Sequence, residues 1–143
     1  KWLYSGSSDK TIRIWDISAS KPSHIFSVRT LLEQAEITSL ATTSNRLLVG
    51  SSNSYVRVWD ISSNSPFSVH LIDTIKDQCP SPVLAVSNDK LFSLSMNRCI
   101  ATSWDLFTVI PKFITNIHNN KDAIVTAMIC SQGQLITALS NNT

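Results

Sequence analysis

The chain repeats a pattern in which two small polar residues are followed by a turn, a short apolar run and Trp-Asp. The pattern is SSDKTIRIWD over Ser7–Asp16 and SSNSYVRVWD over Ser51–Asp60, a spacing of 44 residues. The overlapping stretch LYSGSSD returns at the same spacing as LLVGSSN, LFSLSMN and LITALSN. Four matches at one fixed spacing indicate a repeat architecture, in which each unit buries its apolar surface against its neighbours.

Each unit contains short apolar stretches separated by small polar residues, a pattern typical of β-strands joined by turns. The predicted strands, in chain order, are Thr11–Ile17, His24–Val28, Glu36–Ala41, Arg46–Ser51, Tyr55–Ile61, Val69–Ile75, Val83–Ser87, Lys90–Ser95, Cys99–Leu106, Lys112–Ile117, Ile124–Ile129 and Gln134–Ser140. Several strands are apolar at successive positions, which indicates sheets that are buried on both faces. Only Thr30–Glu36 has the composition for a single helical turn.

The Trp-Asp pairs close the third predicted strand of three units, at Trp15-Asp16, Trp59-Asp60 and Trp104-Asp105. The third pair comes one residue late, because IATSWD holds one residue more than VRVWD. A single extra residue within a strand predicts a β-bulge there.

A repeat of about 44 residues, with four short strands and Trp-Asp at the end of the third, resembles the WD40-repeat family, most closely in SGSSDKTIRIWD. The resemblance implies an all-β fold, a β-propeller fragment of about three and a half four-stranded blades. It implies one partial propeller over residues 1–143, with repeat units at about 1–29, 30–75, 76–117 and 118–143, the last incomplete.

The repeat pattern begins at a second strand and ends before a third. We therefore expect either a fragment that needs the remaining blades of a larger propeller, or a chain of which further copies close the ring. Two open faces between blades are costly to expose to water. We accordingly expect that the isolated chain is not a well-behaved monomer.

The family resemblance also implies a hydrogen-bonded network of a Ser or Thr, an Asp in the turn, a His and the Trp. We expect a buried Trp15 with its indole N–H near Ser5 or Asp9. The Gly-His of the family pattern is missing, since the corresponding stretches are LLEQAE, DQCPSP and HNNKDA. The predicted structural residues are Ser5, Asp9, Trp15, Asp16, Asn53, Trp59, Asp60, Asn97, Trp104 and Asp105.

Composition argues against several classes of function. The net charge is +2, without a run of Lys or Arg, so neither nucleic acid nor a membrane surface is an expected partner. The three cysteines lack CxxC spacing, and the three histidines recur near fourth strands, so we expect no metal and no cofactor. The sparse cysteines favour an intracellular protein, cytoplasmic rather than nuclear.

No set of residues in the sequence predicts catalysis. Three of the ten carboxylates follow a Trp and have a structural explanation, and no Gly-rich phosphate loop is present. Arg13 and Arg57 stand two residues before Trp. Their stems either pack between blades, with the charge at the rim or paired to a neighbouring Asp, or form a basic stripe for phosphate or an acidic peptide.

The resemblance implies a non-catalytic scaffold that binds peptides or domains on a ring face. The alternative is a substrate-recruiting accessory domain of a larger enzyme, such as a ubiquitin ligase or kinase. A hydrolase would need carboxylates or histidines clustered on one ring face. In the family, turns after second strands share a face with connections into first strands, which suggests an acidic or phosphorylated partner at Lys10, Glu36, Tyr55, Met96, Arg98 and Lys121.

Overall fold

A computed structural model describes residues 1–18, 25–63, 65–76, 82–87, 90–94, 100–106, 112–118, 123–131 and 134–141. Side chains are described through residue 106, apart from 100 and 101, and beyond it at Ile129 and Ile136. Most of these residues lie in strands, and this part of the chain contains no α-helix. The predicted all-β fold is therefore confirmed.

The described strands form four antiparallel sheets. The first sheet holds β1 (Trp2–Gly6), β2 (Thr11–Asp16) and β3 (Phe26–Leu32). The second holds β4 (Ile37–Thr42), β5 (Arg46–Ser51), β6 (Tyr55–Asp60) and β7 (His70–Lys76), with the short 3-10 turn η2 (Pro66–Ser68) before β7. The third holds β8 (Val83–Ser87), β9 (Lys90–Leu94), β10 (Ile100–Asp105) and β11 (Lys112–His118), and the fourth pairs β12 (Ala123–Ser131) with β13 (Gln134–Asn141).

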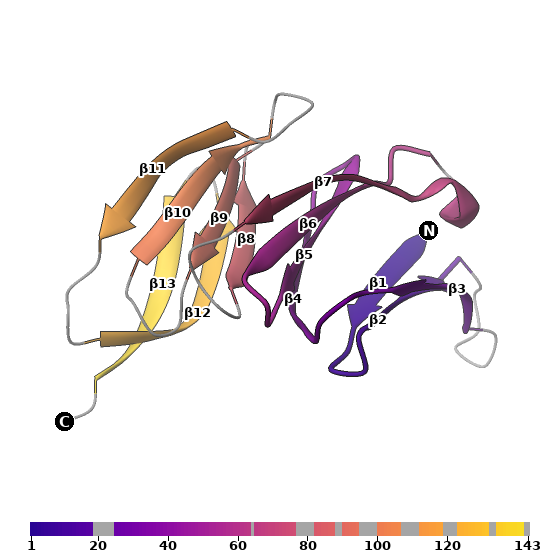
Figure 1. The fold of residues 1–143 in the computed structure, drawn as a ribbon, viewed down its shortest axis with the longest axis horizontal. Coiled ribbons are helices and arrows are strands. Elements are labelled where there is room, and N and C mark those ends of the chain that lie inside the picture. Colours follow the sequence, from indigo (N-terminus) through magenta and orange to yellow (C-terminus); the bar gives the residue numbers. More distant parts are fainter. Residues whose placement is uncertain are drawn as a thin grey trace.

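The four sheets follow one another across the molecule, as their colours show in Figure 1. Neighbouring sheets meet through their first strands, since β4 contacts β1, β8 contacts β4 and β12 contacts β8. The last strands, β3, β7 and β11, lie at the opposite edges of their sheets. Sheets that converge along one edge and diverge along the other form a β-propeller fragment.

Each sheet has two faces, which we name by the order of the chain. The leading face carries the motif Trp and the Leu that pairs with it, Leu3 with Trp15 and Leu47 with Trp59. The trailing face is the opposite face of the same sheet. The leading face of the second sheet, with Leu47, Val49 and Trp59, packs against Ile12 and Ile14 on the trailing face of the first. These residues form one of the two apolar cores found among the described side chains.

The second core lies between the next pair of sheets. Leu48, Val56 and Val58, on the trailing face of the second sheet, pack with Leu84 and Leu91 of the third sheet. Because the second sheet is covered on both faces, every residue of β5 is buried. This explains why the strands are apolar at successive positions in the sequence.

A glycine just before the polar turn allows neighbouring sheets to approach closely. A Cβ at Gly6 would clash with the Cγ2 of Ile37 in β4, and one at Gly50 would lie 3.0 Å from the carbonyl oxygen of Pro82, which directly precedes β8. The two glycines occupy the same place in their repeats. The Gly of the repeated stretch is therefore explained by close contact with the start of the next sheet, at Ile37 for Gly6 and at Pro82 for Gly50.

The helical turn predicted over Thr30–Glu36 is wrong. The strand β3 continues to Leu32, because Leu31 is buried and pairs with Ile12 across the sheet. Burial between two sheets outweighs the weak helical preference of this short stretch.

The explanation of the late third Trp-Asp pair also needs correction. A bulge does precede Trp104, but bulges precede Trp15 and Trp59 as well, in strands that have no extra residue. The register between β9 and β10 is unbroken from the Leu94–Ala101 pair onward. The extra residue therefore lies between Leu94 and Ala101, a stretch that extends beyond the described residues.

Candidate functional site

The motif Trp of the first sheet makes the hydrogen bond expected from the sequence. The Nε1 of Trp15 donates to the Oγ of Ser5 over 2.8 Å. The indole is half-buried rather than fully buried, because the leading face of the first sheet is open in this structure. The predicted bond is thus present, but full burial of Trp15 was wrong.

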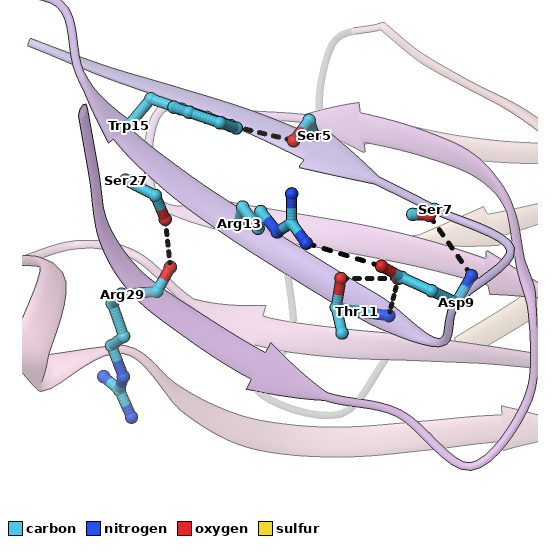
Figure 2. Close-up of polar contacts among 8 residues, drawn as sticks. All are labelled: Ser5, Ser7, Asp9, Thr11, Arg13, Trp15, Ser27 and Arg29. Carbon is cyan, nitrogen blue, oxygen red and sulfur yellow. Dashed lines mark hydrogen bonds and ion pairs between the residues drawn. The ribbon is translucent and has the colours of Figure 1, made fainter. Parts of the chain in front are cut away.

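The turn Asp of the first repeat takes no part in this bond (Figure 2). The Oδ1 of Asp9 accepts from the backbone N of Thr11 over 2.9 Å and from its Oγ1 over 2.6 Å. The Oδ2 lies 3.5 Å from the guanidinium of Arg13. The Thr11 hydroxyl is the main cause that lowers the pKa of the Asp9 carboxyl. This cluster closes the turn on the exposed surface.

The second repeat uses its Trp and Arg differently. The Nε1 of Trp59 donates to the Oε1 of Glu33 over 3.2 Å, and the guanidinium of Arg57 forms an ion pair with the Oε2 of the same carboxylate. The side chain of Glu33 is 1% exposed and that of Arg57 is 12% exposed. Asn53 instead accepts a bond from the Ser51 hydroxyl. Glu33, which is buried, forms with the partly buried Arg57 and Trp59 a polar cluster that we call the acid junction.

The acid junction joins two sheets. Glu33 comes from the connection between β3 and β4, and its backbone N donates to the carbonyl of Lys10 over 2.8 Å. It lies in LLEQAE, the stretch where the family pattern has Gly-His. The sequence prediction missed this role. The sequence does contain a signal that could have pointed to Glu33. Asp77 follows it by 44 residues, so an acidic residue recurs at the repeat spacing.

The Asp after each Trp closes the end of its strand. The Oδ1 of Asp16 accepts from the backbone N of Ser18 over 2.8 Å, and that of Asp60 accepts from Ser62 over 2.7 Å. The side chains of these serines are the main cause that lowers the pKa of both carboxyl groups. Both Asp residues therefore have local structural roles. Asp105 stands at the corresponding end of β10.

Backbone hydrogen bonds tie the loops at one end of the first two sheets together. The carbonyl of Ser7 accepts from the N of Ile37 over 3.2 Å, and that of Glu36 accepts from the N of Ser52 over 2.9 Å. With the Lys10 bond to the connection, they join the turns after β1 and β5 to the β3–β4 connection. We call this region the turn end. It lies along the lower side of Figure 1.

The turn end includes three of the predicted partner-binding residues. Lys10 and Glu36 are exposed and Tyr55 is half-buried. Lys10 and Ser54 take positive φ values of 68° and 67°, so the two turns share one backbone shape. Asn97 and the other predicted partner-binding residues, Met96, Arg98 and Lys121, lie outside the described residues.

Two open grooves follow β1 where it meets β4. One, of about 480 Å³, lies at the end opposite the turn end, with Trp2, Tyr4 and Leu40 in its lining. The other, of about 340 Å³, includes Tyr4, Gly6 and Ile37 in its lining. Partial burial raises the pKa of Tyr4. Neither lining brings an acid and a base together.

The part of the chain that the structure describes holds no group of three His, Cys, Asp or Glu side chains placed to bind a metal ion. Within that same part, no helix is long and apolar enough to cross a membrane.

Comparisons with known proteins agree with this architecture. Residues 1–16 and 24–60 match the family model described as WD domain, G-beta repeat. A search of curated protein sequences found no significant match. Among solved structures, the computationally designed Ika4 protein is 21% identical with a TM-score of 0.74, over 96% of this chain and 79% of that one.

Two further solved structures are longer than this chain. The computationally designed Ika8 protein is 21% identical with a TM-score of 0.71, over 95% of this chain and 39% of that one. A chain of the mitotic checkpoint complex is 19% identical with a TM-score of 0.73, over 96% of this chain and 42% of that one. At these identities the likeness shows the fold alone. Residues 1–16 and 24–60 therefore match WD40 repeats, and the rest of the chain shares the fold of the solved structures.

Proposed function

We propose that the chain acts as a non-catalytic platform that binds a peptide or protein domain on the turn end. WD40 repeats and the propeller fold support a protein-interaction role in general. The observation that carries the specific site is the set of backbone hydrogen bonds that fixes the turns after β1 and β5 to the β3–β4 connection. Loops held by stiff sheets present side chains at little cost in conformational entropy.

An acidic or phosphorylated peptide is the ligand that we propose for this surface. Lys10 is exposed and stands in the turn between β1 and β2, where it takes a positive φ. Tyr55 offers a half-buried aromatic ring with a hydroxyl, the kind of side chain that anchors interfaces. Glu36 brings negative charge to the same end. It would repel an acidic peptide residue placed next to it, and this repulsion would set the register of the peptide.

The test is binding of the chain to an array of acidic, phosphorylated and neutral peptides. We expect binding to phosphorylated or acidic peptides that weakens as salt rises, because exposed charges are screened. Lys10→Ala and Tyr55→Ala should each reduce affinity by about tenfold, whereas Lys90→Ala removes an exposed lysine at the opposite end of the third sheet and should not. Equal binding by all three variants would place the contacts elsewhere.

A substrate-recruiting domain of a larger enzyme would use the same surface. One structural neighbour was solved within a multi-protein assembly, the mitotic checkpoint complex, so a chain of this fold occurs in such an assembly. Fusing the chain to a kinase domain of known activity would test recruitment. We expect faster phosphorylation of a substrate that carries the bound peptide, and no gain with Lys10→Ala.

A further inference from the structure

A group of exposed apolar side chains lies at the outer edge of the junction between the first and second sheets. Its members are Ile25, Phe26, Phe67 and Leu71, of which Phe26 is 61% and Phe67 72% exposed. The other large apolar side chains that are exposed among the described residues lie on the outermost faces of the sheet stack, at Leu3, Leu32, Ile129 and Ile136. The group at the edge differs from these, because both sheets of its junction belong to this chain.

The group draws side chains from both sides of the junction. Phe26 is in the residue pair next to that of the first motif Trp, so it points to the trailing face of the first sheet. Leu71 pairs with the second motif Trp, on the leading face of the second sheet. Phe67 lies in η2, which contacts β3. Val69, just after η2, belongs to the buried core of the junction, so the exposed group continues that core out to the surface.

An arginine at the same edge is bound to the second sheet without an acid. The Nη1 of Arg29 donates to the carbonyl of Pro66 over 2.8 Å and to that of Val69 over 3.1 Å. Its side chain points to the side of the sheet opposite the motif Trp (Figure 2). Arg13 and Arg57 each pair with a carboxylate, whereas no acid of the described residues lies within ion-pair distance of Arg29.

The bonds of Arg29 leave one edge of its guanidinium for a further partner. A guanidinium has five N–H donors, and the two on Nη1 are taken by the two carbonyls. The N–H groups on Nε and Nη2 form the edge that binds a carboxylate through two parallel hydrogen bonds. Arg29 is half-buried, so a carboxylate bound there is partly shielded from water and interacts more strongly than on an open surface.

The second repeat shows that the fold does not require this composition. The strands β3 and β7 have the same pattern of burial along their lengths. At the place of Phe26 the strand β7 has His70, and at the place of Arg29 it has Asp73, each 44 residues later. An aromatic ring and a cation at this edge are therefore particular to the first repeat.

We infer that Phe26, Arg29, Phe67 and Leu71, which we call the rim patch, bind a short peptide segment of a partner protein that carries a carboxylate between apolar side chains. The charge of Arg29 selects the acid, and the apolar residues beside it pack on the two Phe rings and Leu71. Exposed aromatic rings around an arginine have the composition of an interface hot spot. The rim patch shares no residue with the turn end and binds independently of it.

Selection from a random nonapeptide display library, with the 143-residue chain as bait, tests this surface. Peptides that also bind the Phe26→Ser/Phe67→Ser double variant are removed, so binders of every other surface are discarded. The enriched peptides should carry Asp or Glu between apolar residues. Both substituted side chains are largely exposed, and circular dichroism should show an unchanged strand content in the double variant.

Isothermal titration calorimetry with one enriched peptide then measures single changes. Phe26→Ser and Phe67→Ser should each raise the Kd about tenfold, because aromatic anchors contribute much of the binding energy of an interface. Replacing the acid of the peptide with its amide should also raise the Kd about tenfold, and it leaves the fold of the protein untouched. Leu32→Ser, at an exposed apolar side chain outside the rim patch, and Lys10→Ala, at the turn end, should leave the Kd unchanged.

Three results would overturn the proposal. The first is a library without peptides that prefer the wild type to the double variant, and the second is an enriched set without a shared acid. The third is a loss of affinity with Leu32→Ser or Lys10→Ala as large as that with Phe67→Ser. Because Lys10 belongs to the turn end alone, the proposed function and the rim patch can fail separately.

Discussion

The first and second sheets carry nearly the same sequence motif and use it differently. In the first, Trp15 bonds within its own sheet and Arg13 reaches an exposed Asp on the same hairpin. In the second, Trp59 and Arg57 converge on Glu33, which comes from the connection that follows the first sheet. The difference follows from coverage, because only the second of these two leading faces is covered by another sheet.

The comparison separates what a repeat specifies alone from what its neighbour adds. Turn shape, strand pairing and the strand-end Asp bond are the same in both repeats, and all depend on residues close in sequence. The partners of the Trp and Arg side chains differ, and in the second repeat they come from another sheet. The acid junction is therefore a property of the pair of sheets.

The largest expected effect is at the acid junction. Glu33→Ala leaves Arg57, which is largely buried, without its counter-charge and should lower the free energy of unfolding by about 3–5 kcal/mol in urea denaturation. Asp9→Ala removes the exposed partner of Arg13 and should have a much smaller effect. Replacing Glu33 with Leu and Arg57 with Met together should recover most of the loss. Equal losses for the two single variants would remove the distinction between the sheets.

The second prediction concerns the leucines at the same place in the two sheets. Leu47→Ala empties part of the core between the sheets and should cost about 2–5 kcal/mol of unfolding free energy. Leu3→Ala acts on a half-exposed side chain and should cost less than about 1 kcal/mol at concentrations where copies stay apart. Thermal melts of both variants at low protein concentration measure this. A Leu3→Ala cost equal to that of Leu47→Ala would mean that the first sheet is covered in the monomer.

The strand-end Asp residues should give both repeats the same pH dependence. Their pKa values are lowered in the folded state, so the stability that they contribute is present above the ordinary carboxyl pKa near 4 and is lost as pH falls through the folded values. Asp16→Asn and Asp60→Asn should each reduce the loss of stability on acidification. Urea denaturation at a series of pH values from 6 to 2 tests this, and an unchanged pH slope in both variants would contradict it.

The smallest expected effect is in the turns. Lys10 and Ser54 adopt the left-handed region, where a Cβ is unfavourable, so Lys10→Gly and Ser54→Gly should each stabilise the fold by about 0.5–1 kcal/mol. The gain should be similar in both repeats, because the turns share one backbone shape. Differential scanning calorimetry can resolve it. A loss at Lys10 alone would show that its side chain stabilises the turn.

Local features of the fold were largely predictable. Alternation of turn residues and apolar runs predicted β5 and β8 with the bounds that the structure has. The family resemblance named Ser5 or Asp9 as the partner of the Trp15 indole, and Ser5 is the one that accepts its hydrogen bond. The predicted strand bounds were wrong where contact with another sheet determines the length of a strand. β3 extends to Leu32 because Leu31 is buried against the second sheet, and no local pattern carries that contact.

The role of Glu33 could not be predicted from the sequence for the same reason. A carboxylate next to apolar residues has no predicted partner until the stacking of sheets places Arg57 and Trp59 against it. The Gly-His of the family pattern is missing from this stretch, and in the structure Glu33 of the same stretch bonds with Trp59 instead. The repeat spacing located the position, but the chemistry depends on the geometry between sheets.

The position of Glu33 also bears on how such a chain can be duplicated or recombined. A segment copied as one sheet, from β4 to β7, would carry Arg57 and Trp59 but leave their acid behind, at the end of the preceding segment. A copy that begins upstream of the β3–β4 connection would bring all three. The segment that carries a complete acid junction therefore begins before the first strand of its sheet. A graft of the second repeat into another propeller should accordingly start before Glu33.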